Sequence, residues 1–147
     1  MDESLTDKHR RHRVYLFLTR SNGDSPQVLV FDETSSDGQV QTPGGTVEPG
    51  EEPSAAALRE AWEETGLTEF GTPRLLAEDD HENQDERLRR YFYHLPVLGS
   101  TPDAWDHWSR EEGVEGGVTF RLRWIDLPEA PGLHPHFRTY LDRLNLE

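Results

Sequence analysis

Short apolar runs separated by polar turns make up most of this chain, and they predict β-strands. The expected strands are residues 13–19, 27–31, 40–42, 87–95 and 118–125, with a weaker candidate at 74–78. Alternation is clearest in the last strand, where Val118, Phe120 and Leu122 are separated by polar side chains, as in a half-buried antiparallel strand. The first two strands flank the turn-forming segment 21–26 and are therefore expected to pair as a hairpin.

Two segments have the spacing of amphipathic helices. The first is expected to run from Pro53 to Thr65, because proline suits the first position of a helix and Gly66 suits its C-terminal cap. The second is expected at residues 135–144, where four apolar side chains recur at positions i, i+3, i+4 and i+7. These side chains are Phe137, Tyr140, Leu141 and Leu144.

The first predicted helix has an acidic face and an apolar face. Glu60, Glu63 and Glu64 share one face, at spacings i, i+3 and i+4. Like charges at this spacing destabilise a helix by roughly 0.2–0.5 kcal/mol per pair, and a divalent cation bound to carboxylate oxygens removes that cost. The opposite face is expected to pack into the core. It consists of Ala55, Leu58, Ala61 and Trp62.

The remaining segments are expected to be loops around one domain. Residues 1–12 are charged and unpatterned and are expected to form a loose terminus, whereas 79–86 and 99–117 are expected to be polar loops, the second long and irregular. Residues 13–147 are then expected to form a single domain, which is large enough to bury a core. Strands mixed with two helices predict an α/β sandwich, with a mixed sheet between helices.

Composition limits the classes of partner. The net charge is −14, which argues against a protein that binds a nucleic-acid polymer through a basic surface or adheres to an anionic membrane. The chain has no cysteine, so thiol catalysis and cysteine-based zinc sites are excluded. No segment has the pattern of a secretory signal or a membrane span, so a cytoplasmic protein is expected.

The segment that contains the acidic helix resembles the Nudix box, the signature G-x5-E-x7-R-E-U-x-E-E-x-G-U of the Nudix hydrolases, where U is a bulky aliphatic residue. The fixed positions of the signature are matched by Gly45, Glu51, Arg59, Glu60, Glu63, Glu64, Gly66 and Leu67. The departure is Ala61, where the family usually carries a larger aliphatic side chain. Trp62, next to it, is expected to fill the space.

The resemblance implies a Nudix-type α/β/α sandwich with a mixed central sheet, in which the box forms a loop, a helix and a loop. It implies hydrolysis of a diphosphate linkage in a nucleoside diphosphate derivative, with Mg²⁺ or Mn²⁺ as cofactor and a small-molecule nucleotide as partner. A non-catalytic nucleotide-binding module on the same fold and an acidic interaction protein are the alternatives, and the intact box favours the enzyme. Assembly as a homodimer is left open.

Residue roles follow from the same resemblance. Glu60, Glu63 and Glu64 are expected to hold the metal, and Glu60 is also the candidate within the box for orienting or deprotonating water. Arg59 is expected to pair with the box carboxylates and shape the site. Glu51, through its carboxylate, and Gly44, through its carbonyl, are further candidates for the metal shell.

Candidates outside the box rest on weaker signals. Family members often supply a further acidic ligand or base from a loop near the C-terminal strand, which here points to Glu112, with Glu111 and Glu115 as alternatives to it; each could equally be a solvated surface acid. Four aromatic side chains could stack on a base, although packing is the commoner role. They are Tyr91, Tyr93, Trp105 and Trp108. Four arginines could bind phosphate, although exposed strand faces commonly carry such residues. They are Arg87, Arg89, Arg121 and Arg123.

Overall fold

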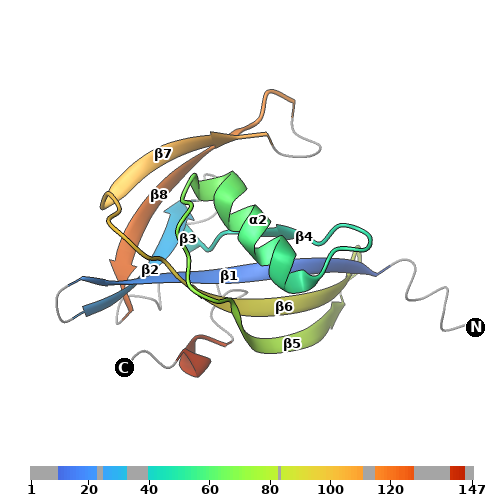
Figure 1. Ribbon diagram of the computed structural model, residues 1–147. Helices are drawn as coiled ribbons and strands as arrows, with labels where there is room; N and C mark the ends of the chain where they lie inside the picture. Colours follow the sequence, from blue (N-terminus) through green and yellow to red (C-terminus); the bar gives the residue numbers. More distant parts are fainter. Residues whose placement is uncertain are drawn as a thin grey trace, which may run out of the picture.

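The computed structural model describes residues 10–22, 25–32, 40–82, 84–110, 115–127 and 140–144. In these residues the chain forms an eight-stranded sheet with one α-helix, α2 (Pro53–Thr65), lying across one face, and a 3₁₀ turn, η2 (Leu141–Arg143), on the other side (Figure 1). The strands are β1 (Arg11–Asn22), β2 (Ser25–Asp32), β3 (Val40–Gln41), β4 (Gly44–Thr46), β5 (Arg74–Glu82), β6 (Arg87–Pro96), β7 (Ala104–Ser109) and β8 (Val118–Asp126). None of the described helices has the length and apolar character needed to cross a membrane.

The sheet is mixed, as predicted. Its main order is β5-β6-β1-β2-β8-β7, with β3 attached to β2 and β4 attached to β1. β1 and β6 run parallel, and the other pairs are antiparallel. The expected hairpin of β1 and β2 is confirmed by the register that pairs Thr19 with Val28. β1 begins at Arg11, so residues 11 and 12 belong to the sheet, and the prediction of a loose terminus is wrong for these two residues.

β1 lies between two apolar layers, because successive side chains of a strand point to opposite faces. Val14, Leu16 and Leu18 belong to the cluster on the α2 side and are fully buried. Tyr15 and Phe17 belong to the cluster on the other side and are at most 5% exposed. Continuous apolar sequence in this strand therefore reflects burial on both faces.

The limits of α2 agree with the prediction, but of its predicted buried face only Ala61 is buried, and Ala55 is exposed. The helix begins at Pro53 and is capped by Gly66, which has φ 78° and donates its N–H to the Trp62 carbonyl at 2.9 Å. Trp62 is 56% exposed, and Leu58 on the same side is 39% exposed. The face against the sheet consists instead of the small, fully buried Ala56, Ala57 and Ala61. Small side chains let the helix backbone lie close to β1 and β4, which leaves no room there for an indole.

The C-terminal segment covers the opposite face of the sheet. Of the predicted helix at 135–144, residues 135–139 lie outside the described residues, and the rest forms only the 3₁₀ turn η2. Tyr140 and Leu141 pack on the second apolar cluster. The Tyr140 hydroxyl donates to Asp79 at 2.6 Å, and Arg90 donates twice to the same carboxylate at 2.7 Å, which fastens this segment to β5 and β6.

Two predicted loops contain strand. β5 continues to Glu82, into the segment 79–86, and β7 lies within the segment 99–117. In β7, half-buried Trp105 and His107 alternate with exposed Asp106 and Trp108, a pattern of mixed aromatic and polar residues that does not stand out as apolar alternation. β7 exists because it pairs with β8 along its whole length, from Ala104 to Ser109.

Candidate active site

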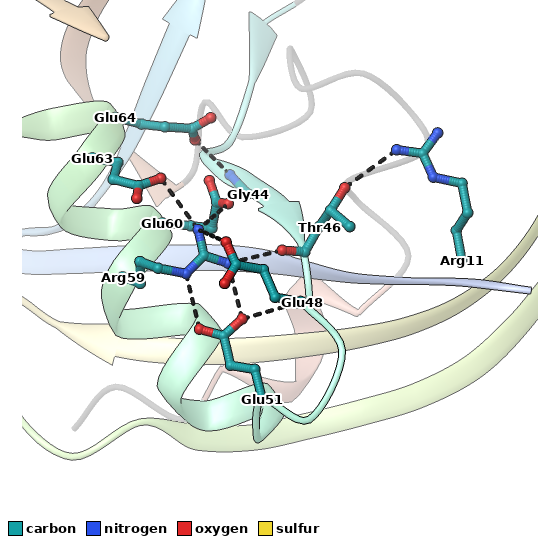
Figure 2. Close-up of polar contacts among 9 residues, drawn as sticks. All are labelled: Arg11, Gly44, Thr46, Glu48, Glu51, Arg59, Glu60, Glu63 and Glu64. Carbon is teal, nitrogen blue, oxygen red and sulfur yellow. Dashed lines mark hydrogen bonds and ion pairs between the residues drawn. The ribbon is translucent and has the colours of Figure 1, made fainter. Parts of the chain in front are cut away.

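Arg59, on α2, lies at the centre of a polar cluster (Figure 2). Its Nε and Nη2 donate to the two carboxylate oxygens of Glu51, each at 2.9 Å, and Nη2 also donates to the Thr46 carbonyl at 2.9 Å. Its Nη1 donates to Glu60 at 2.8 Å and to Glu63 at 3.2 Å. The hydrogen bond to Glu51 is the largest cause of the raised pKa of Arg59, and the same bond lowers the pKa of Glu51. Arg59 therefore joins the loop before the helix to the acidic face of the helix.

Glu64 is held against the backbone of β4. It is 5% exposed, and its Oε1 accepts a hydrogen bond from the Gly44 N–H at 2.8 Å. A Cβ at Gly44 would overlap the carbonyl oxygen of Val14 on the paired strand β1. Glycine at this position therefore allows β4 to lie close to β1, which brings its N–H to the carboxylate.

The carboxylates of the acidic face open into one hollow of about 400 Å³, called here the carboxylate hollow. It is lined by Thr46, Glu48, Arg59, Glu60, Glu63, Glu64, Ser109 and Arg110. Gly45 sets the position of one of these groups, because a Cβ there would overlap the carboxyl carbon of Glu60. Among the described lining residues, Ser109 and Arg110 come from the end of β7 and the residue after it, and the others belong to the box.

β7 is fixed to the C-terminal end of α2 by two side chains. The Trp105 indole N–H donates to the Thr65 carbonyl at 2.9 Å. The Nε2 atom of His107 lies 3.0 Å from the Glu63 carbonyl oxygen. A Cβ at Gly66 would lie 3.0 Å from the His107 ring, so the helix cap also fits closely against this strand. These contacts fix where the end of β7 lies relative to the acidic face.

A second hollow of about 540 Å³, called here the basic hollow, shares Thr46 and Glu48 with the first. Its basic side chains come from the start of β1 and the residue before it. They are Arg10, Arg11 and His12, and Tyr91 also lines the hollow. Arg11 donates to the Thr46 hydroxyl at 3.2 Å, so Thr46 contacts an arginine on each side (Figure 2). The two hollows therefore lie next to each other, on either side of Thr46 and Glu48.

Comparison with known proteins identifies the family. A family model for the NUDIX domain matches residues 9–144. The chain belongs to the Nudix family. Diphosphoinositol polyphosphate phosphohydrolase 2 of Mus musculus is 43% identical over 141 residues, which cover 92% of this chain and 72% of that protein. Diphosphoinositol polyphosphate phosphohydrolase 3-alpha of Homo sapiens is 40% identical, with 92% and 79% covered.

Solved structures agree on the Nudix fold. A binary complex of the Ap4A hydrolase of C. elegans superposes with a TM-score of 0.65 at 16% identity, covering 90% of this chain and 93% of that one. The MutT protein of Methanosarcina mazei Go1 gives a TM-score of 0.60 at 22% identity, with 91% of each chain covered. At these identities the likeness shows the fold alone. The homologues at 40% identity and above are named phosphohydrolases, and this chain is a Nudix hydrolase.

The structure brings the central part of the predicted Nudix site together. Glu60, Glu63, Glu64 and Arg59 line the carboxylate hollow. Glu51 lines the basic hollow instead, with both carboxylate oxygens bonded to Arg59. Gly44 contacts Glu64 through its N–H. The metal-binding roles of all of these residues stay predictions.

The predicted residues outside the box are dispersed. Glu111 and Glu112 lie outside the described residues, and Glu115 is exposed and lines neither hollow. Tyr93 is buried in the core, and Trp105 is bonded to α2. Three of the four arginines form ion pairs on the strands, namely Arg87 with Glu82, Arg89 with Glu78 and Arg123 with Asp32. The fourth, Arg121, is exposed on β8 and lines neither hollow.

Sequence reasoning missed part of the site. Thr46 and Glu48 lie within the loop of the box and could have been found there. Ser109 and Arg110 have no local signal, because only the pairing of β7 with β8 brings them to the helix.

The donors of the carboxylate hollow suit a divalent cation of the kind that Nudix hydrolases use. Glu60, Glu63 and Glu64 offer hard carboxylate oxygens from one helix face to one hollow. Within the part of the chain that the structure describes, no three acidic or histidine side chains converge as a preformed metal cage. Arg59 lies between the carboxylates of Glu51, Glu60 and Glu63. A carboxylate has two oxygens, so Glu60 and Glu63 could each bind a cation through one oxygen while the other accepts a hydrogen bond from Arg59.

Proposed function

We propose that this Nudix hydrolase cleaves a diphosphate linkage in an anionic small molecule, with Mg²⁺ or Mn²⁺ held by Glu60, Glu63 and Glu64. The observation that carries the proposal is that these three carboxylates share one hollow large enough for a diphosphate. Magnesium binds one or two carboxylates and fills its shell with water and substrate phosphate oxygens, so an open hollow suits it better than a closed cage.

The chemistry follows from the charge of the substrate. Phosphate oxygens repel a nucleophile, and a bound cation would neutralise that charge and lower the pKa of a bound water. Glu60 would accept the proton as the water oxygen bonds to phosphorus. The bond from phosphorus to the bridging oxygen would break in line with the attack, and the leaving phosphate would keep the electron pair. Glu112 is the alternative base.

Arg59 would act on the carboxylates rather than on the substrate. It contacts Glu60 and Glu63 while its other donors hold Glu51 and the Thr46 carbonyl. The guanidinium therefore limits the repulsion among neighbouring carboxylates when no cation is bound. This role would make Arg59 a positioning residue.

The substrate candidate with most support is a diphosphate carried on a multiply phosphorylated small molecule, such as a diphosphoinositol polyphosphate. Two observations support it. Relatives with that name are 36–43% identical to this chain over 92% of its length. The basic hollow shares Thr46 and Glu48 with the carboxylate hollow, and its Arg10 and Arg11 could receive further phosphate groups in place of their ion-pair partners Asp80 and Glu86.

A nucleoside diphosphate derivative is the second candidate. The observation in its favour is Tyr91, an aromatic side chain on the wall of the basic hollow that could contact a base. Its hydroxyl lies 2.9 Å from Nδ1 of His12, and the two rings are stacked with centroids 5.9 Å apart.

A hydrolysis assay that separates the products by chromatography tests the function and the substrate together, because cleavage of ADP-ribose or a dinucleoside tetraphosphate releases no free phosphate. The purified protein should be assayed with Mg²⁺ and separately with Mn²⁺ against a diphosphoinositol polyphosphate, ADP-ribose, a dinucleoside tetraphosphate and a nucleoside triphosphate. We expect turnover of at least one substrate, loss of turnover in EDTA, and the highest kcat/KM for the diphosphoinositol polyphosphate. Absence of turnover across the panel with either metal would favour the non-catalytic binding module. A higher kcat/KM for a nucleotide would replace the first substrate candidate with the second.

A further inference from the structure

Arg59 has no donor left for a substrate phosphate. A guanidinium carries five N–H groups. In this protein Arg59 makes five hydrogen bonds, two to Glu51 and one each to Glu60, Glu63 and the Thr46 carbonyl. A phosphate could bond to Arg59 only by displacing one of these partners. All N–H donors of Arg59 are therefore used by hydrogen-bond acceptors within the protein.

Among the described residues that line the carboxylate hollow, Arg110 is the other cation. It follows β7 directly, its residue is exposed, and it faces the hollow together with Ser109. Among the described residues, no carboxylate forms an ion pair with Arg110. This differs from Arg59 and from the paired arginines of the strands, such as Arg89 and Arg123.

Described residues before and after Arg110 in the sequence are held by contacts with the sheet. Before it, Ser109 pairs with Val118 of β8. Beyond it, the Trp108 indole N–H donates to the Gly116 carbonyl at 3.0 Å, and Gly117 lies so close to the Trp108 ring that a Cβ would overlap it. β7 is in turn bonded to α2 through Trp105 and His107. The position of Arg110 relative to the acidic face is thus set by the sheet and the helix.

We propose that Arg110 is a substrate-binding residue, whose guanidinium contacts non-bridging oxygens of the diphosphate from the β7 side of the carboxylate hollow. Among the described residues that line the hollow are four carboxylates and, besides Arg110, one internally bonded arginine, so these groups repel a diphosphate unless other positive charge reaches it. A guanidinium forms two parallel hydrogen bonds with phosphate oxygens, which fixes orientation as well as charge. Arg110 would hold the diphosphate against the helix that carries the metal ligands. The inference rests on the proposed function, because it takes a diphosphate as the ligand of this hollow.

Three variants separate this role from a general effect of charge. Arg110→Ala removes the guanidinium, and Arg110→Lys keeps the charge but not the planar fork. Arg121→Ala is the matched control, because Arg121 is exposed on β8 and alternates with Phe120 and Leu122, which face the α2 side. Arg121→Ala removes the same charge from β8, on the face of the sheet that points away from α2.

Two readouts are needed, one of them independent of turnover. The first is kcat and KM for the best substrate of the wild-type protein. The second is the affinity for methylenediphosphonate, a non-hydrolysable diphosphate, measured by calorimetry in the presence of Mg²⁺. We expect Arg110→Ala to lower kcat/KM by about 10- to 100-fold, mainly through KM, and to weaken methylenediphosphonate binding by at least about tenfold. Arg110→Lys should lie between wild type and Arg110→Ala.

The outcomes separate this inference from the proposed function. If the wild-type protein turns over a substrate and Arg110→Ala stays within about twofold of it in both readouts, Arg110 is not a phosphate contact although the hydrolase stands. An equal loss in Arg121→Ala would also overturn the inference, since it would show a long-range effect of charge. If no substrate is turned over, methylenediphosphonate binding alone decides, and a loss confined to the Arg110 variants still supports the contact.

Discussion

Glu51 receives two hydrogen bonds from one guanidinium, that of Arg59, with both donor–acceptor distances at 2.9 Å. The two residues stand eight positions apart, one in the loop before α2 and one in the helix. Charge-assisted bidentate pairs are the strong form of this interaction, and their geometry is specific. The pair therefore sets how the box loop lies against the helix that carries the remaining glutamates.

Glu51→Gln tests this pair. An amide keeps the shape but loses the charge, and one of its two ends would turn an N–H group toward the guanidinium. We expect a loss of about 1–2 kcal/mol in the free energy of unfolding and at least a fivefold loss in kcat/KM, measured by urea denaturation and the hydrolysis assay. Glu52→Gln is the control, because Glu52 is adjacent and exposed and its side chain does not cap the helix. Equal effects of the two substitutions would show that the pair has no special role.

Glu64→Gln tests the predicted metal ligand. The amide oxygen can still accept the hydrogen bond from the Gly44 N–H, so the fold should change little. We expect activity to fall by about 10²–10⁴-fold, because the charge that holds the cation is gone. The rise in melting temperature with added Mg²⁺ should also shrink. Activity within a few-fold of wild type would remove Glu64 from the ligand set.

Gly45→Ala tests the close contact between β4 and Glu60. The added methyl would overlap the Glu60 carboxyl, so that carboxylate must move. We expect kcat to fall at least about tenfold, which corresponds to roughly 1.4 kcal/mol in the barrier. Gly50→Ala is a useful comparison, because Gly50 has φ 79° and a Cβ added there would meet no other atom within 4 Å. It should cost about 1 kcal/mol of stability and leave kcat unchanged; a similar loss of kcat in both variants would point to the loop backbone instead.

Trp62→Ala tests which face of α2 is buried. Trp62 is 56% exposed, so its removal should change the free energy of unfolding by less than about 1 kcal/mol. Phe92→Ala provides the scale, since Phe92 is fully buried and its loss should cost about 3–5 kcal/mol. Chemical denaturation measures both. A loss near 3 kcal/mol for Trp62→Ala would mean that the indole is covered in solution.

His94 gives a pH-dependent prediction. It is 7% exposed, its Nε2 lies 2.7 Å from the Thr19 hydroxyl, and burial, followed by the charge of Arg74, lowers the pKa of His94 from its ordinary value of 6.5. Above that value His94 is neutral in both states, and its full contribution to stability is present. As the pH falls through 6.5, the unfolded chain takes up a proton that the folded protein resists, so stability is lost until the folded pKa is reached.

We expect this effect to separate the wild-type protein from His94→Gln. Between pH 7.5 and 5.5, the wild type should lose up to about 1 kcal/mol per pH unit that the variant does not lose. Urea denaturation at three pH values in this window measures the difference. Parallel losses in the two proteins would assign the pH dependence to other groups.

The sequence alone determined the local features of the box. Pro53 and Gly66 mark the two ends of α2, because a fixed φ at the start and a positive φ at the end are properties of single residues. The spacing of Glu60, Glu63 and Glu64 places them on one face of any helix, so their approach to one hollow could also be predicted. Strand positions with apolar alternation, such as β8, followed from the same local reasoning.

Only the tertiary structure decided which face of α2 is buried and what lies opposite the glutamates. Hydrophobicity favoured Leu58 and Trp62 for the core, whereas close packing against β1 and β4 selected the small Ala56, Ala57 and Ala61. Contacts with strands that are distant from α2 in the sequence determine which face of the helix is buried. Arg110 reaches the carboxylate hollow because β7 pairs with β8 and bonds to the end of α2. The pairing of β7 with β8 depends on the free energy of the whole sheet, to which residues distant in the sequence contribute. The residues next to Arg110 in the sequence therefore do not predict this pairing.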